Sequence, residues 1–332
     1  MNYRYLTGFT GTRGYLLVTE EGACLFTDFR YTQQAGEQAP GLEIREIGTR
    51  WVEDMHRYLN EKKIGELGLE KDYISYQLYA LFSEKWPDIK LRPEDKLTAS
   101  LRLIKDPEET AAIQEAVDLA DQAFTYILGH IKPGLEEREI ALKLEVYLRE
   151  AGASERSFDF IVASGKRGAL PHGVASHKVL QQGDLVTLDF GGILKGYCSD
   201  ITRTLCLGKA GDRQKEIYRL VREGQERGLK AVKAGVTGEE ADKVVRDFFG
   251  EAGYGEYFGH GLGHGVGIEI HELPHVNHLG TTPLTPGNII TIEPGIYLPE
   301  LGGVRIEDLV LVTEKGYEVL SKSRKELVEI PV

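Results

Sequence analysis

The sequence predicts an α+β protein of two domains, in which helices cover a curved antiparallel sheet. Three observations support this prediction: the chain length, an internal repeat of helical segments, and the pairs of strand-like segments that follow each copy of the repeat. The chain has 332 residues, which suggests about two domains at roughly 100–200 residues each. Charged residues make up 28% and hydrophobic residues 41%, a balance typical of globular proteins rather than of disordered or fibrous ones.

Residues 1–96 are expected to form the smaller domain, an α/β unit. Short apolar runs predict strands at 15–18, 23–26 and 64–69. The apolar spacing of residues 51–59 predicts a helix. The turn Glu20-Glu21-Gly22 joins the first two runs into a predicted β-hairpin. Because the chain begins close to its first strand, we expect that a preceding strand is missing.

Residues 97–332 are expected to form the second domain. The segment Asp106-Pro107-Glu108-Glu109 predicts the start of a helix, because it combines an N-cap residue, a proline at the first helical position and a glutamate three residues after the cap. Apolar residues then keep helical spacing as far as Leu128, and again from Ile140 to Ala151. Two helices that each pack one face against a core are therefore predicted.

An internal repeat organises this second domain. Residues 131–152 align without gaps on residues 232–253, at an offset of 101 positions (232 − 131). We interpret the repeat as a duplicated half-domain, with a chance match of two helix–turn segments as the alternative. Strand-like segments follow each copy, at 185–190 and 197–205, and at 289–292 and 304–312. Two such units predict a pseudo-twofold domain, with the functional site on the concave, uncovered side of the sheet.

Composition excludes several classes of function. Forty Lys and Arg against 52 Asp and Glu give a net charge of −12, so nucleic acid and anionic membranes are poor partners. The three cysteines fit no disulfide framework and no CxxC metal site; Cys198 and Cys206 are expected to be buried neutral thiols. No apolar run reaches the ~18 residues of a membrane span, and no signal peptide is evident. A cytoplasmic protein is expected.

Acidic residues recur at the strands of both halves. Asp189 ends an apolar strand, and Asp200 follows a glycine turn on the returning strand. An Asp beside glycines ordinarily caps turn amides, but Asp is disfavoured inside strands. Glu293 and Glu307 repeat the arrangement in the second half. Four carboxylates in one partly buried place would repel one another unless a multivalent cation lies among them.

Histidines complete the predicted metal site. His260, His264 and His271 lie within twelve residues among glycines. One histidine with four carboxylates suits Mn²⁺, with Co²⁺ or Zn²⁺ as alternatives, better than a structural zinc site rich in thiolates. Two divalent ions ~3.5–4 Å apart can activate water and polarise a carbonyl group. The sequence therefore predicts a metal site in which such chemistry can take place.

These motifs resemble those of the metallopeptidases with the pita-bread fold, which include creatinase, prolidase, aminopeptidase P and methionine aminopeptidase. The segment from His260 to Glu272 resembles the proline-peptidase signature. Further matching segments are 188–191, 199–204, 293–297 and 303–308. Residues 4–9 and 27–31 resemble the creatinase-type N-terminal domain, and the similarity implies that an initial strand and helix of that domain are absent here.

The resemblance also implies roles for individual residues. Two metal ions are expected, with Asp200 and Glu307 bridging them. The five implied ligands are Asp189, Asp200, His264, Glu293 and Glu307. Glu293 is expected to relay a proton to the leaving prolyl nitrogen, while His172 and His271 donate hydrogen bonds to the peptide and the tetrahedral oxyanion. His260 and Tyr297 are expected to line the proline pocket. Arg305 is expected either to orient Glu307 or to bind a substrate carboxylate.

The resemblance implies hydrolysis of the Xaa-Pro bond in short proline-containing peptides. A prolidase, which cleaves dipeptides, is expected, with an aminopeptidase P acting on longer peptides as the alternative. Prolidases of this type often have an arginine four residues after the position of His271, where this chain has His275; protonated His275 or Arg305 would then bind the free carboxylate. A non-catalytic peptide-binding relative is the remote alternative, since all five ligands are present. A homodimer formed through the N-terminal domain is also implied.

Overall fold

The computed structural model describes residues 1–332 and divides into two compact units, Met1–Leu101 and Arg102–Val332. The boundary predicted between residues 96 and 97 falls just before the short helix α5 (Ala99–Arg102), which spans this division. None of the helices combines the length and the apolar character that crossing a bilayer requires.

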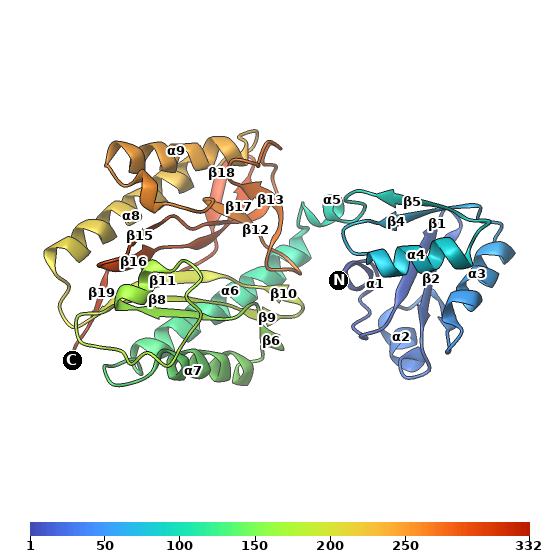
Figure 1. The fold of residues 1–332 in the computed structure, drawn as a ribbon, viewed down its shortest axis with the longest axis horizontal. Coiled ribbons are helices and arrows are strands. Elements are labelled where there is room, and N and C mark those ends of the chain that lie inside the picture. Colours follow the sequence, from blue (N-terminus) through green and yellow to red (C-terminus); the bar gives the residue numbers. More distant parts are fainter. The chain divides into compact units, whose positions relative to one another are not determined.

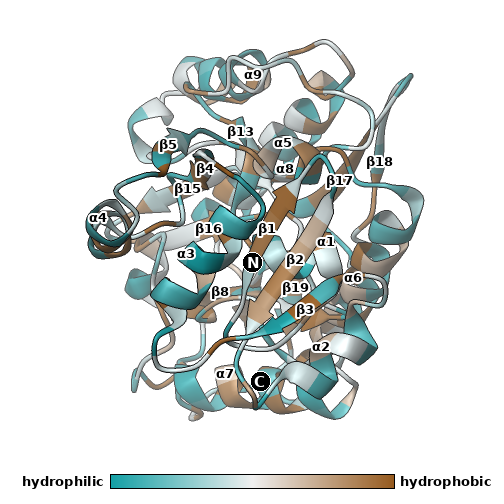
Figure 2. Cartoon of the chain, turned by 90° about the vertical axis from the view of Figure 1, so that its right-hand side faces the viewer, coloured by the Kyte–Doolittle hydropathy of each residue, from teal (hydrophilic) through white to brown (hydrophobic).

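The first unit is an α/β unit built on the predicted hairpin. Strands β1 (Tyr15–Thr19) and β2 (Gly22–Thr27) pair antiparallel, and β3 (Glu43–Glu46) joins β2 in parallel. A separate parallel pair is formed by β4 (Glu66–Glu70) and β5 (Lys90–Glu94). The remaining helices are α1 (Asn2–Thr7), α2 (Thr32–Gln38), α3 (Trp51–Glu61) and α4 (Tyr76–Lys85). Hydrophobic residues are concentrated on the β1–β2 hairpin (Figure 2), whose buried side packs into one core with α3 and α4.

The second unit has two pairs of helices. The first pair is α6 (Pro107–Leu128) and α7 (Glu137–Glu150), and the second is α8 (Asp212–Ala231) and α9 (Gly238–Glu251). The predicted capping box begins α6, because the Asp106 side chain accepts from the amide of Glu109 at 2.8 Å while the Glu109 side chain accepts from the amide of Asp106 at 2.9 Å. The strands of the unit lie between the two helix pairs (Figure 1).

The structure supports the interpretation of the repeat as a duplicated half-domain. Helices α7 and α9 are both 14 residues long and begin 101 positions apart (238 − 137). Each begins with a capping box, and the residue before each helix forms an isolated bridge to a later loop: Glu136 with Val179, and Thr237 with Pro283. A chance match of two short segments would not reproduce these long-range contacts.

Each half is built on one sheet, and the C-terminal strand β19 joins the sheet of the first half. The first sheet has the order β19-β11-β8-β7, and the second the order β13-β12-β14-β17-β18. Their strands are β7 (Ile161–Ser164), β8 (Leu185–Phe190), β11 (Ile201–Leu207), β19 (Val328–Ile330), β12 (Gly263–Gly265), β13 (Glu272–Val276), β14 (Ile289–Ile292), β17 (Asp308–Thr313) and β18 (Gly316–Val319). Smaller strands are β6 (Glu155–Arg156), β9 (Gly192–Leu194), β10 (Tyr197–Cys198), β15 (Gly295–Leu298) and β16 (Gly302–Arg305), and two 3₁₀ turns span Gly165–Ala169 and Gly255–Tyr257.

Two predicted strands are each split in the structure. The segment predicted at 197–205 becomes β10, which pairs with β9, and β11, which pairs with β8. The segment predicted at 304–312 becomes β16, which pairs with β15, and β17, which pairs with β14. Asp200 and Glu307 lie in these two breaks, where the chain leaves one strand partner and joins another. The breaks therefore place an acidic side chain at the same point of each half.

Candidate metal centre

In the first half, tight backbone packing brings two aspartates together. Strands β8 and β11 pair so that Asp189 lies opposite Thr202, two residues after Asp200. Gly191 follows β8, and a Cβ atom at this position would lie 1.8 Å from the carbonyl oxygen of Ser199. Only glycine therefore allows the chain after Asp189 to pass so close to the residue before Asp200.

The second half repeats this arrangement with glutamates. Glu293 directly follows β14, and Glu307 directly precedes β17. The two strands pair with Ile292 opposite Asp308, so both glutamates lie at the same end of the strand pair. The amide of Glu293 donates to the carbonyl of Leu262 at 2.8 Å, and that of Glu307 donates to the carbonyl of Thr202 at 3.1 Å. The second bond joins the two halves at the site.

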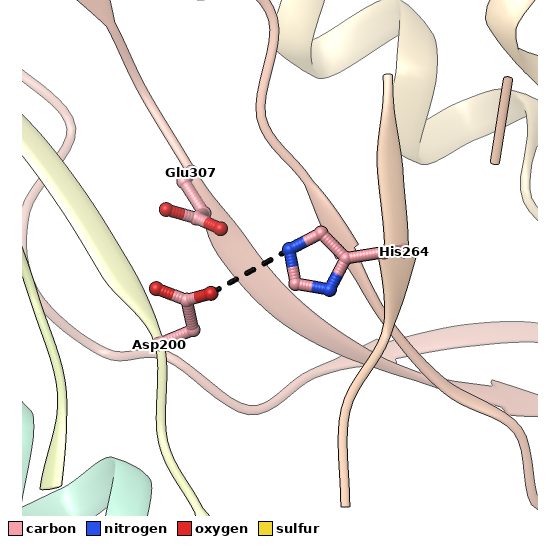
Figure 3. A group of neighbouring side chains, drawn as sticks. All are labelled: Asp200, His264 and Glu307. Atoms are coloured by element: carbon pink, nitrogen blue, oxygen red, sulfur yellow. Dashed lines mark ion pairs between the residues drawn. The ribbon is translucent and has the colours of Figure 1, made fainter. Parts of the chain in front are cut away.

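The acids of both halves meet around one histidine. Asp200, His264 and Glu307 each offer a ligand atom, and these atoms lie within 4.8 Å of one another (Figure 3). Nε2 of His264 is 3.7 Å from Oδ2 of Asp200 and 3.4 Å from Oε1 of Glu293. Asp189, the remaining expected ligand, forms an ion pair with Arg305, whose Nη2 lies 2.6 Å from Oδ2 of Asp189.

Burial and mutual repulsion make the ionised form of these acids unfavourable. Burial, then the neighbouring Glu307 and Asp189, raise the pKa of Asp200 well above its ordinary value. Burial, then Glu293 and Asp189, do the same to the pKa of Glu307. Burial raises the pKa of Glu293 to about 7, although Arg305 opposes the shift. A divalent cation among the carboxylates would remove this repulsion.

The polar atoms that remain open fit a metal ion. Oδ1 of Asp189 and Oδ1 of Asp200 are buried and have no hydrogen-bond partner, which is costly unless a further group satisfies them. Nδ1 of His264 lies 3.1 Å from the carbonyl of Gly265, so an Nδ1–H donor leaves the lone pair of Nε2 directed at the acids. Burial and His271 lower the pKa of His264 to about 4, which keeps the ring neutral, as a metal ligand must be.

Two threonines, which the sequence analysis missed, orient the glutamates. The hydroxyl of Thr202 donates to Oε2 of Glu307 at 2.5 Å. The hydroxyl of Thr291 donates to Oε1 of Glu293 at 3.1 Å and accepts from the amide of His264 at 3.0 Å. For Thr291 the available signal was its two-residue spacing to Glu293, because residues two apart on a strand share a face. Spacing gave no such signal for Thr202, whose partner Glu307 is 105 positions away.

Arg305 is a buried hub of the site. It is 3% exposed and donates from Nη2 to Asp189, from Nε to Oγ1 of Thr202 at 3.1 Å, and from Nη1 to the hydroxyl of Tyr297 at 2.8 Å and to the carbonyl of Pro171 at 3.2 Å. It therefore orients Asp189 directly and reaches Glu307 only through Thr202. This geometry favours a positioning role over the expected alternative of binding a substrate carboxylate.

His260 and Tyr297 form a second hydrogen-bonded group beside Arg305. Nε2 of His260 is 2.7 Å from the Tyr297 hydroxyl, and Nδ1 of His260 is 2.8 Å from the carbonyl of Gly261. Burial and Arg305 lower the pKa of His260 to about 3, so the neutral ring accepts from Tyr297. Burial raises the pKa of Tyr297 to about 12. The ring of the buried Phe258 is centred 5.1 Å from that of His260, so His260 packs between the rings of Phe258 and Tyr297.

Three further predicted residues are exposed to solvent: His172, His271 and His275. The His271 ring is centred 4.3 Å from the His264 ring. Partial burial of this ring lowers the pKa of His271; the nearby Asp189 opposes the shift, and His172 adds to it. His275 lies opposite His264 in the β12–β13 pair. Cys198 and Cys206 are buried free thiols, as expected.

Comparison with known proteins assigns the family. Residues 111–314 match the model of metallopeptidase family M24, and residues 1–104 match the creatinase/prolidase N-terminal domain. The chain belongs to metallopeptidase family M24. The predicted pita-bread fold class and the prediction of a metallopeptidase are thereby confirmed.

Relatives match this M24 peptidase over nearly its whole length. The Xaa-Pro dipeptidase of Pyrococcus furiosus is 41% identical over 324 residues, which cover 96% of this chain and 91% of that protein. The solved Xaa-Pro dipeptidase from Bacillus anthracis is 49% identical with a TM-score of 0.96, covering 100% of this chain and 92% of that one. The solved X-Pro aminopeptidase from Thermotoga maritima is 41% identical with a TM-score of 0.93, covering 99% of this chain and 93% of that one.

Proposed function

We propose that this M24 peptidase is a prolidase, an Xaa-Pro dipeptidase, that uses two divalent metal ions. One observation carries the metal site: carboxylates from both halves converge on His264 and leave two buried oxygens without partners. The proposed ligands are Asp189, Asp200, His264, Glu293 and Glu307. Four carboxylates and one imidazole favour Mn²⁺, with Co²⁺ or Zn²⁺ as alternatives. The Xaa-Pro substrate is supported by the relatives named above.

The metal ions, when bound, supply a Lewis acid that polarises the scissile carbonyl and makes water a stronger nucleophile. The protein contributes a proton carrier. Thr291 donates to Oε1 of Glu293, so Oε2 is the oxygen left to take a proton and deliver it to the leaving nitrogen. In the metal-free site burial raises the pKa of Glu293 to about 7, so its surroundings favour the protonated form, as a carboxyl group that carries a proton requires.

The exposed histidines supply donors to the substrate. We infer that His172 and His271 donate hydrogen bonds to the peptide and to the oxyanion that develops during attack. His271 lies against His264, which places it beside the proposed metal ligands. The lowered pKa of His271, caused mainly by burial, makes it a neutral donor at physiological pH.

The aromatic rings beside Arg305 suit contact with a proline ring. An Xaa-Pro bond lacks the amide hydrogen that other peptide bonds offer, so recognition has to rely on contacts with the ring. His260 and Tyr297 offer two rings joined by a hydrogen bond, and the buried Phe258 packs against His260. We infer that His260 and Tyr297 line the proline subsite.

The substrates of a dipeptidase and an aminopeptidase differ after the proline: the dipeptide ends there in a free carboxylate, whereas the longer peptide continues. His275 is exposed and lies opposite His264 across β12 and β13, where a protonated imidazole can bind a free carboxylate. This position favours a dipeptidase, while the relative from Thermotoga maritima supports aminopeptidase P as the alternative.

Paired substrates separate these functions. Initial rates of Ala-Pro and Ala-Pro-Ala hydrolysis are measured with the Mn²⁺-loaded protein, and Glu293→Ala serves as the blank. Cleavage of the dipeptide alone is expected. Cleavage of both peptides would identify an aminopeptidase P, and cleavage of neither, with no metal bound, would identify a non-catalytic relative.

We further infer a cytoplasmic homodimer. The three cysteines are unpaired thiols, as in a reducing compartment, and the N-terminal unit matches the creatinase/prolidase N-terminal domain. Light scattering on the protein as it elutes from a size-exclusion column is expected to give twice the mass of one chain. A monomer at all concentrations would contradict this inference.

A further inference from the structure

A fully buried carboxylate outside the metal centre has no role in the chemistry described so far. Glu137, the first residue of α7, is 0% exposed. Oε1 accepts from the amide and the hydroxyl of Ser164, both at 2.8 Å. Oε2 accepts from the amide and the hydroxyl of Ser176, at 3.2 and 2.7 Å, and from Arg167. All five partners are donors, so the site is built for an ionised carboxylate, which only accepts.

The two serines are the two ends of one loop. Residues 165–175, here called the His172 loop, run from Ser164, the last residue of β7, to Ser176. Both ends are therefore bonded to the same carboxylate. Arg167 adds a cross-connection within the loop, because its Nη2 donates to the carbonyl of Val174 at 2.9 Å. His172 lies exposed between these fixed points.

The other side of the loop contacts the metal centre. Arg305, which pairs with Asp189, also donates to the carbonyl of Pro171 at 3.2 Å. The residue next to His172 is thus bound from the active site, while Glu137 binds the ends of the same loop from behind. Lys178 extends the rear anchor, since its ammonium donates to Oγ of Ser164 and to Asp184, both at 2.7 Å.

The duplication shows that Glu137 is not needed to form the helix. The equivalent position in the second half is Gly238 (137 + 101), and α9 has the same length as α7 and the same kind of capping box. A Cβ atom at Gly238 would lie 2.0 Å from the carbonyl oxygen of His275. The second half therefore closes this space with backbone, whereas the first half fills it with a carboxylate that holds a loop.

We propose that Glu137 is a positioning residue for peptide hydrolysis, which acts by fastening both ends of the His172 loop and so fixing His172 beside the metal centre. The part that concerns His172 rests on the proposed function. The part that concerns the loop does not, and the two are tested by separate measurements.

The first measurement needs no catalytic activity. Lys166 is exposed in the His172 loop, so trypsin can cut there once the loop opens. Cleavage after Lys166 and Arg167, relative to cleavage elsewhere in the chain, is followed by mass spectrometry in wild type, Glu137→Gln and Glu145→Gln. Glu145 lies on the same helix, but its ion pairs are with Arg149 and Arg156, outside the loop. We expect cleavage in the loop to be at least about fivefold faster in Glu137→Gln alone; equal rates would overturn the proposal.

The second measurement is a double-mutant cycle on Ala-Pro hydrolysis. Glu137→Gln is expected to lower kcat/KM by about 10 to 100-fold at unchanged metal content, but by less than about twofold when His172 is already alanine. An equal loss in both backgrounds would refute positioning through His172. Should Glu137→Gln fail to fold, Ser176→Ala removes one donor from the same carboxylate and replaces it in both measurements. If the wild type cleaves no proline peptide, the proposed function fails, while the trypsin measurement still decides the role of Glu137 in the loop.

Discussion

Nη2 of Arg305 lies 2.6 Å from Oδ2 of Asp189, and this buried ion pair joins the two halves of the duplicated domain. Arg305 ends β16 in the second half, and Asp189 lies in β8 of the first half. The pair occupies one oxygen of Asp189 and leaves Oδ1 without a partner. Neither half alone can therefore complete the centre.

Arg305→Met should destabilise the metal-free protein by about 3–5 kcal/mol, because it leaves Asp189 buried without its cation. Metal should restore part of this loss, since the bound ion supplies the missing positive charge. The free energy of unfolding in urea, measured with EDTA and with Mn²⁺, checks both expectations. Arg57→Met, which removes an exposed pair with Asp54, should change stability by less than about 1 kcal/mol. Equal effects of the two substitutions would contradict the role of Arg305.

The metal-free protein should lose stability as pH rises above 6.5. Burial raises the folded-state pKa of Asp200, Glu307 and Glu293, the last to about 7. The folded state therefore binds more protons than the unfolded state, so the free energy of unfolding falls with rising pH. Below 6.5, the ordinary histidine pKa, His260 and His264 have the opposite effect, because burial lowers their folded-state pKa to about 3 and 4.

Urea unfolding at pH 6.5 and about pH 8 measures this slope. With EDTA the free energy of unfolding should decrease, and Glu293→Gln should make the decrease smaller. With saturating Mn²⁺ the trend should reverse, since metal binding displaces protons from its ligands. A metal-free protein whose stability rises over this interval would show that the carboxylates do not crowd one another.

Thr291→Val should alter the pH dependence of catalysis. The Thr291 hydroxyl lowers the pKa of Glu293 by donating to it, so its removal should shift the limb of the kcat profile that reports Glu293 to higher pH. The amide of His264 also loses its acceptor, at a cost of about 1–3 kcal/mol in stability. Thr187→Val is the control, since that hydroxyl contacts Thr204 and Gly303 rather than a carboxylate. An unchanged kcat profile in Thr291→Val would show that Thr291 does not influence the pKa of Glu293 during catalysis.

Cys198→Ala should leave the metal content per chain unchanged. Burial raises the pKa of the Cys198 thiol to about 12, and the thiol contacts the carbonyl of Ile268 at 3.5 Å. A neutral thiol is no metal ligand, although its truncation should cost about 1 kcal/mol as lost packing. Metal analysis after dialysis checks the expectation, and loss of metal would contradict the proposed ligand set.

Local patterns in the sequence predicted much of the fold. The β1–β2 hairpin and the start of α6 follow from turn and capping residues, and the duplication follows from matched segments. Strand β5 escaped prediction, because Lys90–Glu94 is polar and contains a proline, and its place depends on pairing with distant β4. The residues around β5 give no indication that it pairs with β4.

The site shows the same limit. The resemblance of the motifs to those of the metallopeptidases implied the five ligands, yet the breaks at Asp200 and Glu307 arise because the chain changes strand partners. The pairing of Arg305 with Asp189 joins residues 116 positions apart, so no local spacing indicates which acid it contacts. The role of Thr291 was open to prediction from its two-residue spacing to Glu293, whereas that of Thr202 was not, because its hydroxyl donates to Glu307, 105 positions away.

The most direct test is the initial rate of Ala-Pro hydrolysis as Mn²⁺ is added to the metal-free protein, with bound metal counted per chain. The rate should rise until two ions are bound per chain and then stay constant, while Glu293→Ala remains inactive throughout. Two bound ions without cleavage of Ala-Pro would show that this metal centre acts on another substrate.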